Sequence, residues 1–323
     1  MAPRRRIGLL VALLALVAIA VVAVAVLSVG GGSSASTPAD AKPRAGRPPL
    51  SLVLGLRADP ESRTLARAAA LYNAGRPDAA ARLFARYDSL PARVGAALST
   101  WPSGSLERLE ELANLYPSSG VVQLHLGLAR LWAGQGDPTA AWQDAQDADP
   151  DSPYAILAGN LLHANLPRGL PAFIPSFAAP PGIARLPADR QLGALRSLAR
   201  RGGARDWILY GVGLQRVGKP VSARRAFDRA AQLAPGDPQA RVAAAVGLFE
   251  KDDPTPAFAH LGPLTREFPQ EPTVRFHLAV LLLWTGRIPA AERQLRLAAR
   301  TRPGSPIARE AARYLDTILK ARS

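Results

Sequence analysis

Residues 206–235 read DWILYGVGLQRVGKPVSARRAFDRAAQLAP, and this stretch has the pattern of two short helices joined by a tight turn. A small residue at Gly211 lets the two helices approach closely, and Phe227 is expected to fill the gap between this unit and its neighbour. Pro235 ends the second helix, because its ring removes an amide donor and clashes with the preceding turn. The stretch therefore predicts a helix pair over residues 206–236.

The same pattern returns every 34 residues along the carboxyl-terminal part of the chain, as Pro235, Pro269 and Pro303 show. Other positions that keep the step are Pro238, Pro272 and Pro306; Ala223, Ala257 and Ala291; and Phe227, Leu261 and Leu295. A fixed period of this size indicates a supersecondary unit that is stacked on copies of itself. We expect helix pairs at 206–236, 240–270 and 274–304.

This unit resembles the tetratricopeptide repeat. The residues that carry the resemblance are Trp207, Gly211 and Leu214 in the first helix and Ala223, Phe227, Ala230 and Pro235 in the second. The later units depart from the family pattern, with Arg241 and Arg275 at the tryptophan position and Leu264 where a small residue is usual. The resemblance implies an all-α helical solenoid that binds other proteins and does not catalyse a reaction.

Related but more divergent units come earlier in the chain, within residues 59–150. His125-Leu126-Gly127 matches His277-Leu278-Ala279 in spacing, so the two histidines occupy equivalent positions and are expected to share a packing role. Residues 151–205 do not match, and we interpret them as one widened repeat with a Pro-rich loop at 165–188. Residues 307–323 are expected to form a helix that caps the three repeats of 206–306.

The amino terminus has the features of a membrane anchor. Arg4-Arg5-Arg6 precedes an uncharged apolar run, Ile7 to Val29, whose length as a helix is about 34 Å, enough to cross a bilayer. Residues 1–6 are then cytoplasmic, residues 7–29 form a transmembrane helix, and the body is extracytoplasmic at the cell membrane. The alternative is a signal peptide that is cleaved to release a secreted adaptor.

Residues 30–58 are rich in Gly, Ser and Pro and are predicted to be a linker. The part up to Pro49 has too little apolar surface to bury and is expected to be disordered. The apolar run Leu50 to Leu56 is too short to assign to a helix or a strand.

Charge and composition narrow the possible partners. The chain has no cysteine, which excludes disulfides, thiolate metal sites and a cysteine nucleophile. The net charge is +15, and the carboxyl-terminal half is the basic half. A basic surface suits an anionic lipid or wall polymer, although a simply solvated surface is the plainer interpretation. No nucleic-acid-binding motif is present, so no nucleic acid partner is expected.

No catalytic or cofactor-binding motif is evident. The four histidines lack the spacing of metal ligands, and there is no nucleophile elbow, phosphate-binding loop or dinucleotide fingerprint. We therefore expect no metal, no cofactor and no enzymatic activity. The alternative from a different class is an envelope enzyme, or a subunit of an enzyme complex, that uses the 165–188 loop.

The function predicted is a membrane-anchored extracytoplasmic scaffold or adaptor that binds a protein or peptide partner. In the family that the repeats resemble, the first helix of each pair lines a concave groove. This implies a groove formed by Arg205, Ile208, Val212, Arg216, Val242, Val246, Phe249, Phe276, Val280, Leu283 and Trp284. The alternative is that Phe276, Leu283 and Trp284 belong to the core and pack against the terminal helix.

The predicted topology can be tested by protease treatment of cells whose outer boundary has been made permeable, followed by fractionation. Protease should digest the body, and the undigested chain should remain with the membrane fraction, because residues 7–29 anchor it. A body protected from protease, or a mature chain free in the medium, would contradict this topology.

Overall fold

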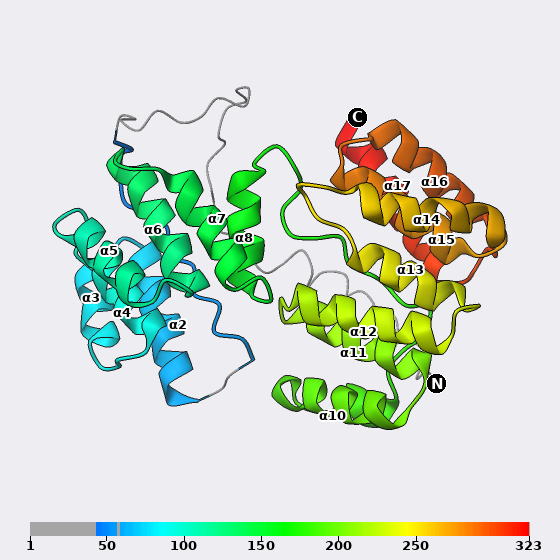
Figure 1. The fold of residues 1–323 in the computed structure, drawn as a ribbon, viewed down its shortest axis with the longest axis horizontal. Helices are drawn as coiled ribbons and strands as arrows, with labels where there is room; N and C mark the ends of the chain where they lie inside the picture. Colours follow the sequence, from blue (N-terminus) through cyan, green and yellow to red (C-terminus); the bar gives the residue numbers. More distant parts are fainter. Residues whose placement is uncertain (1–42, 57–58, 323) are drawn as a thin grey trace. The chain divides into compact units, whose positions relative to one another are not determined.

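The computed structural model describes residues 43–56 and 59–322, and these residues contain sixteen helices and no strand. Consecutive helices pack against one another as antiparallel pairs, which is the arrangement of a tetratricopeptide-like solenoid (Figure 1). The fold is therefore all-α, as predicted. The run from Ile7 to Val29 lies outside the described residues, and none of the described helices is long and apolar enough to span a bilayer.

The helices form two arrays. The first array comprises residues 43–162 and has three helix pairs followed by a single helix. Its helices are α2 (Pro60–Asn73), α3 (Pro77–Phe84), α4 (Leu90–Ser99), α5 (Ser105–Leu115), α6 (Gly120–Ala133), α7 (Pro138–Ala148) and α8 (Pro153–Leu162).

The second array comprises residues 170–322 and also contains three helix pairs, at the positions that the 34-residue period predicts. Its helices are α9 (Pro181–Ala184), α10 (Ala188–Arg201), α11 (Ala204–Arg216), α12 (Pro220–Leu233), α13 (Pro238–Gly247), α14 (Thr255–Glu267), α15 (Pro272–Trp284), α16 (Ile288–Arg300) and α17 (Pro306–Arg322). Helix α17 packs on α15 and α16, and its residues Ile307 and Ala311 are buried there.

Prolines and aspartates set where many of these helices begin. Asp59, Asp137 and Asp237 each precede a helix whose first residue is proline, and each carboxylate accepts a hydrogen bond of 2.8 Å from an amide of the first turn. Proline is tolerated at that position because its missing N–H would have no partner within the helix. The carboxylate satisfies one of the amides that remain free.

Contacts between an aromatic ring and a helical glycine bring neighbouring helices close together. A Cβ atom at Gly211 in α11 would lie 2.3 Å from the ring of Phe227 in α12. The same arrangement occurs in the first array, where a Cβ at Gly95 would lie 2.5 Å from Phe84 and one at Gly127 would lie 2.4 Å from Trp142. Only glycine leaves room for the ring at these positions, so the close approach inferred for Gly211 is present.

Two regions differ from the predictions made from the sequence, namely the predicted linker at 30–58 and the predicted widened repeat at 151–205. Residues 151–205 do not form one unit, because α8 packs on α6 and α7 of the first array whereas α10 packs on α11 of the second. Residues 43–56 run along the first array, with Pro48 buried and Leu50 only 1% exposed. Local composition could not reveal this, because the apolar surface that covers Leu50 comes from helices farther along the chain.

Replacing Gly211 with Leu should destabilise the fold by roughly 1–3 kcal/mol, because the added side chain must displace the buried ring of Phe227. Gly193 on the exposed side of α10 is a matched control, since a Cβ there meets no atom within 4 Å. Urea unfolding should show a lower midpoint for Gly211→Leu and no loss for Gly193→Leu. Equal midpoints for the two variants would contradict the packing described for α11 and α12.

Candidate functional site

The first helices of the three pairs in the second array, α11, α13 and α15, pack side by side and form a face that we call the second inner face. An extended stretch of the chain, residues 170–177 with the sequence LPAFIPSF, lies along this face, and we call it the second segment. The amide of Phe173 donates to Gln215 Oε1 on α11 (3.2 Å). The amide of Ile174 donates to His277 Nε2 on α15 (2.9 Å).

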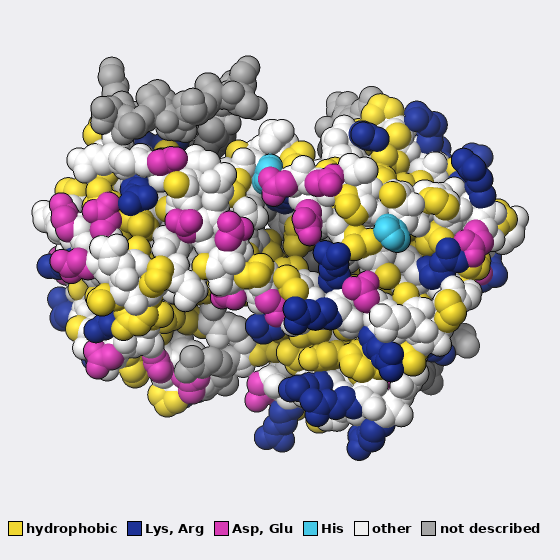
Figure 2. All heavy atoms as spheres, viewed as in Figure 1, with side chains coloured by type: hydrophobic (Ala, Val, Ile, Leu, Met, Phe, Trp, Pro, Cys, Tyr) yellow, Lys and Arg dark blue, Asp and Glu magenta, His cyan; other side chains and the backbone are white. Residues whose placement is uncertain are grey.

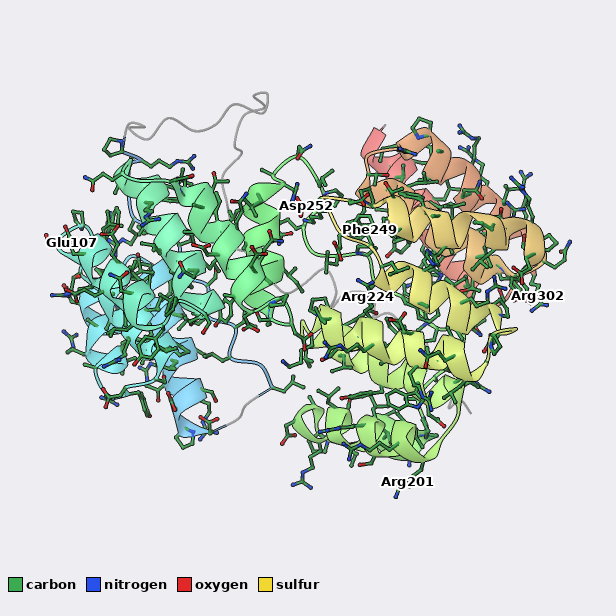
Figure 3. The ribbon with its side chains drawn as sticks, viewed as in Figure 1. Glu107, Arg201, Arg224, Phe249, Asp252 and Arg302 are labelled. Carbon is green, nitrogen blue, oxygen red and sulfur yellow. The ribbon has the colours of Figure 1, made fainter. Side chains whose placement is uncertain are left out.

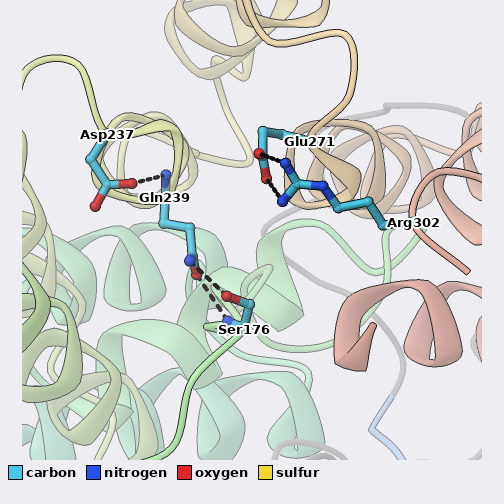
Figure 4. Close-up of polar contacts among 5 residues, drawn as sticks. All are labelled: Ser176, Asp237, Gln239, Glu271 and Arg302. Atoms are coloured by element: carbon cyan, nitrogen blue, oxygen red, sulfur yellow. Dashed lines mark hydrogen bonds and ion pairs between the residues drawn. The ribbon is translucent and has the colours of Figure 1, made fainter. Parts of the chain in front are cut away.

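The remaining helix of this face, α13, binds the carboxyl-terminal end of the segment through Gln239 (Figure 4). The Ser176 amide donates to Gln239 Oε1 at 2.9 Å, and Gln239 Nε2 donates back to Ser176 Oγ at 2.6 Å. The backbone of Gln239 is itself fixed by the carboxylate of Asp237, which caps α13. Each first helix therefore contributes one polar side chain that binds the backbone of the second segment.

Aromatic side chains provide the apolar part of the contact. Phe173 is 2% exposed, and its ring stacks on His277 with centroids 4.6 Å apart and meets the edge of Phe227 at 5.8 Å. Phe177 is only partly buried, and the guanidinium of Arg205 lies 4.3 Å from the centre of its ring. Phe173 is thus the deeply buried anchor of the segment, and Phe177 is a more accessible contact near its end.

The first array repeats this arrangement with residues 43–54, which we call the first segment. The first inner face is formed by α2, α4 and α6, and the amide of Ser51 donates to His125 Nε2 on α6 at 3.1 Å. Asn73 on α2 binds both the N–H and the carbonyl of Leu50. Further bonds to the backbone of this segment come from Tyr72, Trp101, Trp132 and Tyr154.

The two equivalent histidines have the same environment in both arrays. Nδ1 of His125 lies 2.6 Å from the carbonyl of Val121, and Nδ1 of His277 lies 2.7 Å from that of Thr273. Because a carbonyl can only accept, Nδ1 carries the proton in both rings, and Nε2 is left to accept the N–H of the segment. Complete burial lowers the pKa of both histidines to about 4, against the smaller opposing effect of the carbonyl hydrogen bond.

The sequence-based groove residues fall into three groups in the structure. Arg205 and Arg216 are exposed, and Val212, Leu283 and Trp284 are partly buried. The other six are buried: Ile208, Val242, Val246, Phe249, Phe276 and Val280. The Phe276 ring lies 5.4 Å from that of Tyr314 on α17, which favours the core interpretation for Phe276.

The residues that contact the backbone of the second segment are others: Gln215, Gln239 and His277. Of these, only His277 could have been identified from the sequence, because it repeats His125. Nothing in the sequence pairs these side chains with residues 173–176, because the contact joins parts of the chain that are 42, 63 and 103 positions apart.

A surface cavity adjoins one end of each segment. A cavity of about 560 Å³ lies beside Phe177 and is lined by residues that include Arg205, Leu209 and Asp237. A cavity of about 550 Å³ lies at the start of the first segment, between Trp101 and Trp132. In each array, one end of the segment therefore lies beside a surface cavity.

Comparisons with known proteins add little to this description of the fold and the site. No protein-family model matches the chain, and no curated protein matches it. Among solved structures, the chain is similar to one described as "Crystal structure of APC/C hetero-tetramer Cut9-Hcn1", with 16% sequence identity and a TM-score of 0.26. The match covers 79% of this chain and 55% of that one. The fold assignment rests on the helix pairs themselves.

The buried histidines predict a dependence of stability on pH. Their folded-state pKa of about 4 lies below the ordinary value of 6.5, so the unfolded chain binds more protons between these values. The free energy of unfolding should fall as pH falls from about 6.5 to about 4, by up to roughly 3 kcal/mol for each histidine. Urea unfolding at several pH values measures this loss.

A variant with His125→Gln and His277→Gln should lose most of this dependence, because glutamine does not titrate. The variant His260→Gln, at an exposed histidine on α14, is the matched control for the substitution itself. If the double variant and the unaltered chain show the same slope between pH 4 and 6.5, the histidines are not the groups responsible.

Proposed function

We propose that this chain is an interaction scaffold that binds an extended segment of a partner protein on the inner faces of its helical repeats. The observation that supports the proposal is that the same kind of face holds an extended segment twice, once in each array. In both cases a histidine accepts an amide N–H, and apolar side chains cover the rest. Contacts of this kind suit any extended chain that can offer N–H groups and an apolar anchor.

The proposed scaffold is anchored in the cell membrane by residues 7–29, with residues 1–6 in the cytoplasm and the repeats outside. The support is the basic cluster Arg4–Arg6 and the 23-residue apolar run that follows it. The proposed role is binding without catalysis, and its support is that the sequence carries no recognised catalytic or phosphate-binding motif.

The exposed arginines of the second array are the groups available to an anionic lipid or wall polymer. Four of them lie on α10, a helix that has only one acidic residue: Arg190, Arg196, Arg200 and Arg201. Lys and Arg side chains gather over α10 and α12 on the face shown in Figure 2, and Figure 3 labels Arg201 at the end of α10. A contact of this kind would be weakened by salt, because it rests on exposed charges.

Site-specific photo-crosslinking in the cells that naturally express the chain tests the scaffold proposal. Arg216 at the end of α11 is exposed and next to Gln215, so a photo-reactive p-benzoylphenylalanine there should form an adduct with the partner. The same amino acid in place of Arg225, which is exposed on the second helix of that pair, is the matched control.

We expect one adduct of defined mass from position 216 in intact membranes and none from position 225. An adduct from position 225 alone would mean that the partner binds elsewhere on the repeats. No adduct at either position, in membranes where the chain is folded, would contradict the scaffold proposal.

A further inference from the structure

We propose that the second segment, residues 170–177, is an exchangeable internal ligand that occupies the binding site of a partner. The partner would present an extended, uncharged segment with an aromatic anchor and adjacent prolines. This inference rests on the proposed scaffold function and names the kind of partner. It starts from how the segment is held.

The second segment is held through few main-chain contacts. Its amides at Phe173, Ile174 and Ser176 donate to side chains of the inner face. Within the described residues, no main-chain carbonyl of 170–177 accepts a hydrogen bond, and no main-chain group of the segment bonds to the main chain of a helix. Removing the segment therefore leaves every helix with its own hydrogen bonds intact.

The first segment, in contrast, is bound on both sides of its main chain. The carbonyls of Gly46, Pro48 and Leu50 accept from side chains of the first array, and the amide of Arg44 donates to the main-chain carbonyl of Trp132. Leu50 is bound through its N–H as well. The first segment is thus the more firmly fixed of the two and serves as an internal comparison.

The ends of the second segment are suited to its release. On the amino-terminal side, Gly169 and the carbonyl of Pro167 are held by Asn160 and Lys251, so this end stays attached when the segment leaves. On the carboxyl-terminal side, Phe177 is partly exposed beside the 560 Å³ cavity, and Ala178 and Pro180 line the same cavity. An incoming chain can occupy this end first.

The chemistry of the site defines the partner's segment. The pocket between Phe227 and His277 takes a planar ring, and the neutral imidazole and two glutamine amides accept N–H groups without attracting charge. Proline has no N–H to donate, so prolines fit only at positions that do not donate, as Pro171 and Pro175 do here. The described contacts to Phe173, Ile174 and Ser176 are all made by uncharged side chains, and the charged Arg205 contacts the segment only at Phe177.

The test uses the purified full-length chain and a fluorescent synthetic peptide, RGLPAFIPSFAA, that copies residues 168–179. An attached segment competes at an effective concentration of about millimolar, so the peptide should bind the unaltered chain weakly. The variant Phe173→Ala weakens the internal segment and leaves the face intact. We expect this variant to bind the peptide at least about tenfold more tightly, as measured by fluorescence anisotropy.

A second variant covers the case in which Phe173→Ala fails to fold. Ser176→Pro removes the N–H and the hydroxyl through which the internal segment binds Gln239, and it leaves the buried ring of Phe173 in place, so it should also increase peptide binding. A peptide with alanine at the position of Phe173 is the control for the anchor and should not bind. A peptide that copies residues 46–55 should bind neither variant more tightly than it binds the unaltered chain.

A folded Phe173→Ala or Ser176→Pro variant that binds the peptide no better than the unaltered chain would overturn the proposal and make the segment a permanent part of the fold. A doubled mass in light scattering would indicate that two copies exchange their segments. That result would overturn the proposal that the site binds an external partner. Either result leaves the photo-crosslinking test of the scaffold function unaffected, because that test detects any partner close to position 216, whichever segment the partner presents.

Discussion

The close packing of an aromatic ring on a helical glycine is the contact on which the rest of the structure depends. Where Phe227 lies against Gly211, α11 and α12 come close enough to exclude water between them. Trp142 against Gly127 does the same for α6 and α7 in the first array. Contacts of this kind hold the pairs α6/α7 and α11/α12 together, and a third, between Phe84 and Gly95, joins α3 to α4 of the next pair. The first helices of successive pairs align and leave an apolar face on one side.

The apolar inner face of each array must be shielded from water. In each array an extended segment of the protein covers part of that face. Extended segments cover much of the inner faces, and Leu50 and Phe173 are almost fully buried as a result. A buried amide without a partner is costly, so the N–H groups of the segments need acceptors. Uncharged side chains supply them, among which His125 and His277 are the clearest because they are buried, neutral and equivalent.

The two arrays differ in how completely they bind their segments, and the proposed exchange of the second segment rests on this difference. The first segment uses both N–H and carbonyl groups, whereas the second uses N–H groups and one buried ring. A face that recognises mainly the backbone of an extended chain is open to other chains of the same shape. Under the proposed function, the second inner face would combine a structural role with that of a binding site.

The sequence by itself determined the helix pairs of the second array, because glycine, proline and ring positions act locally and recur with a period of 34. It also established that His125 and His277 are equivalent. Only the tertiary structure decided that residues 43–54 and 170–177 cover the inner faces, and that Gln215 and Gln239 contact the second segment. The physical reason is that an extended segment has no periodicity of its own, and its partners are side chains far away in the sequence.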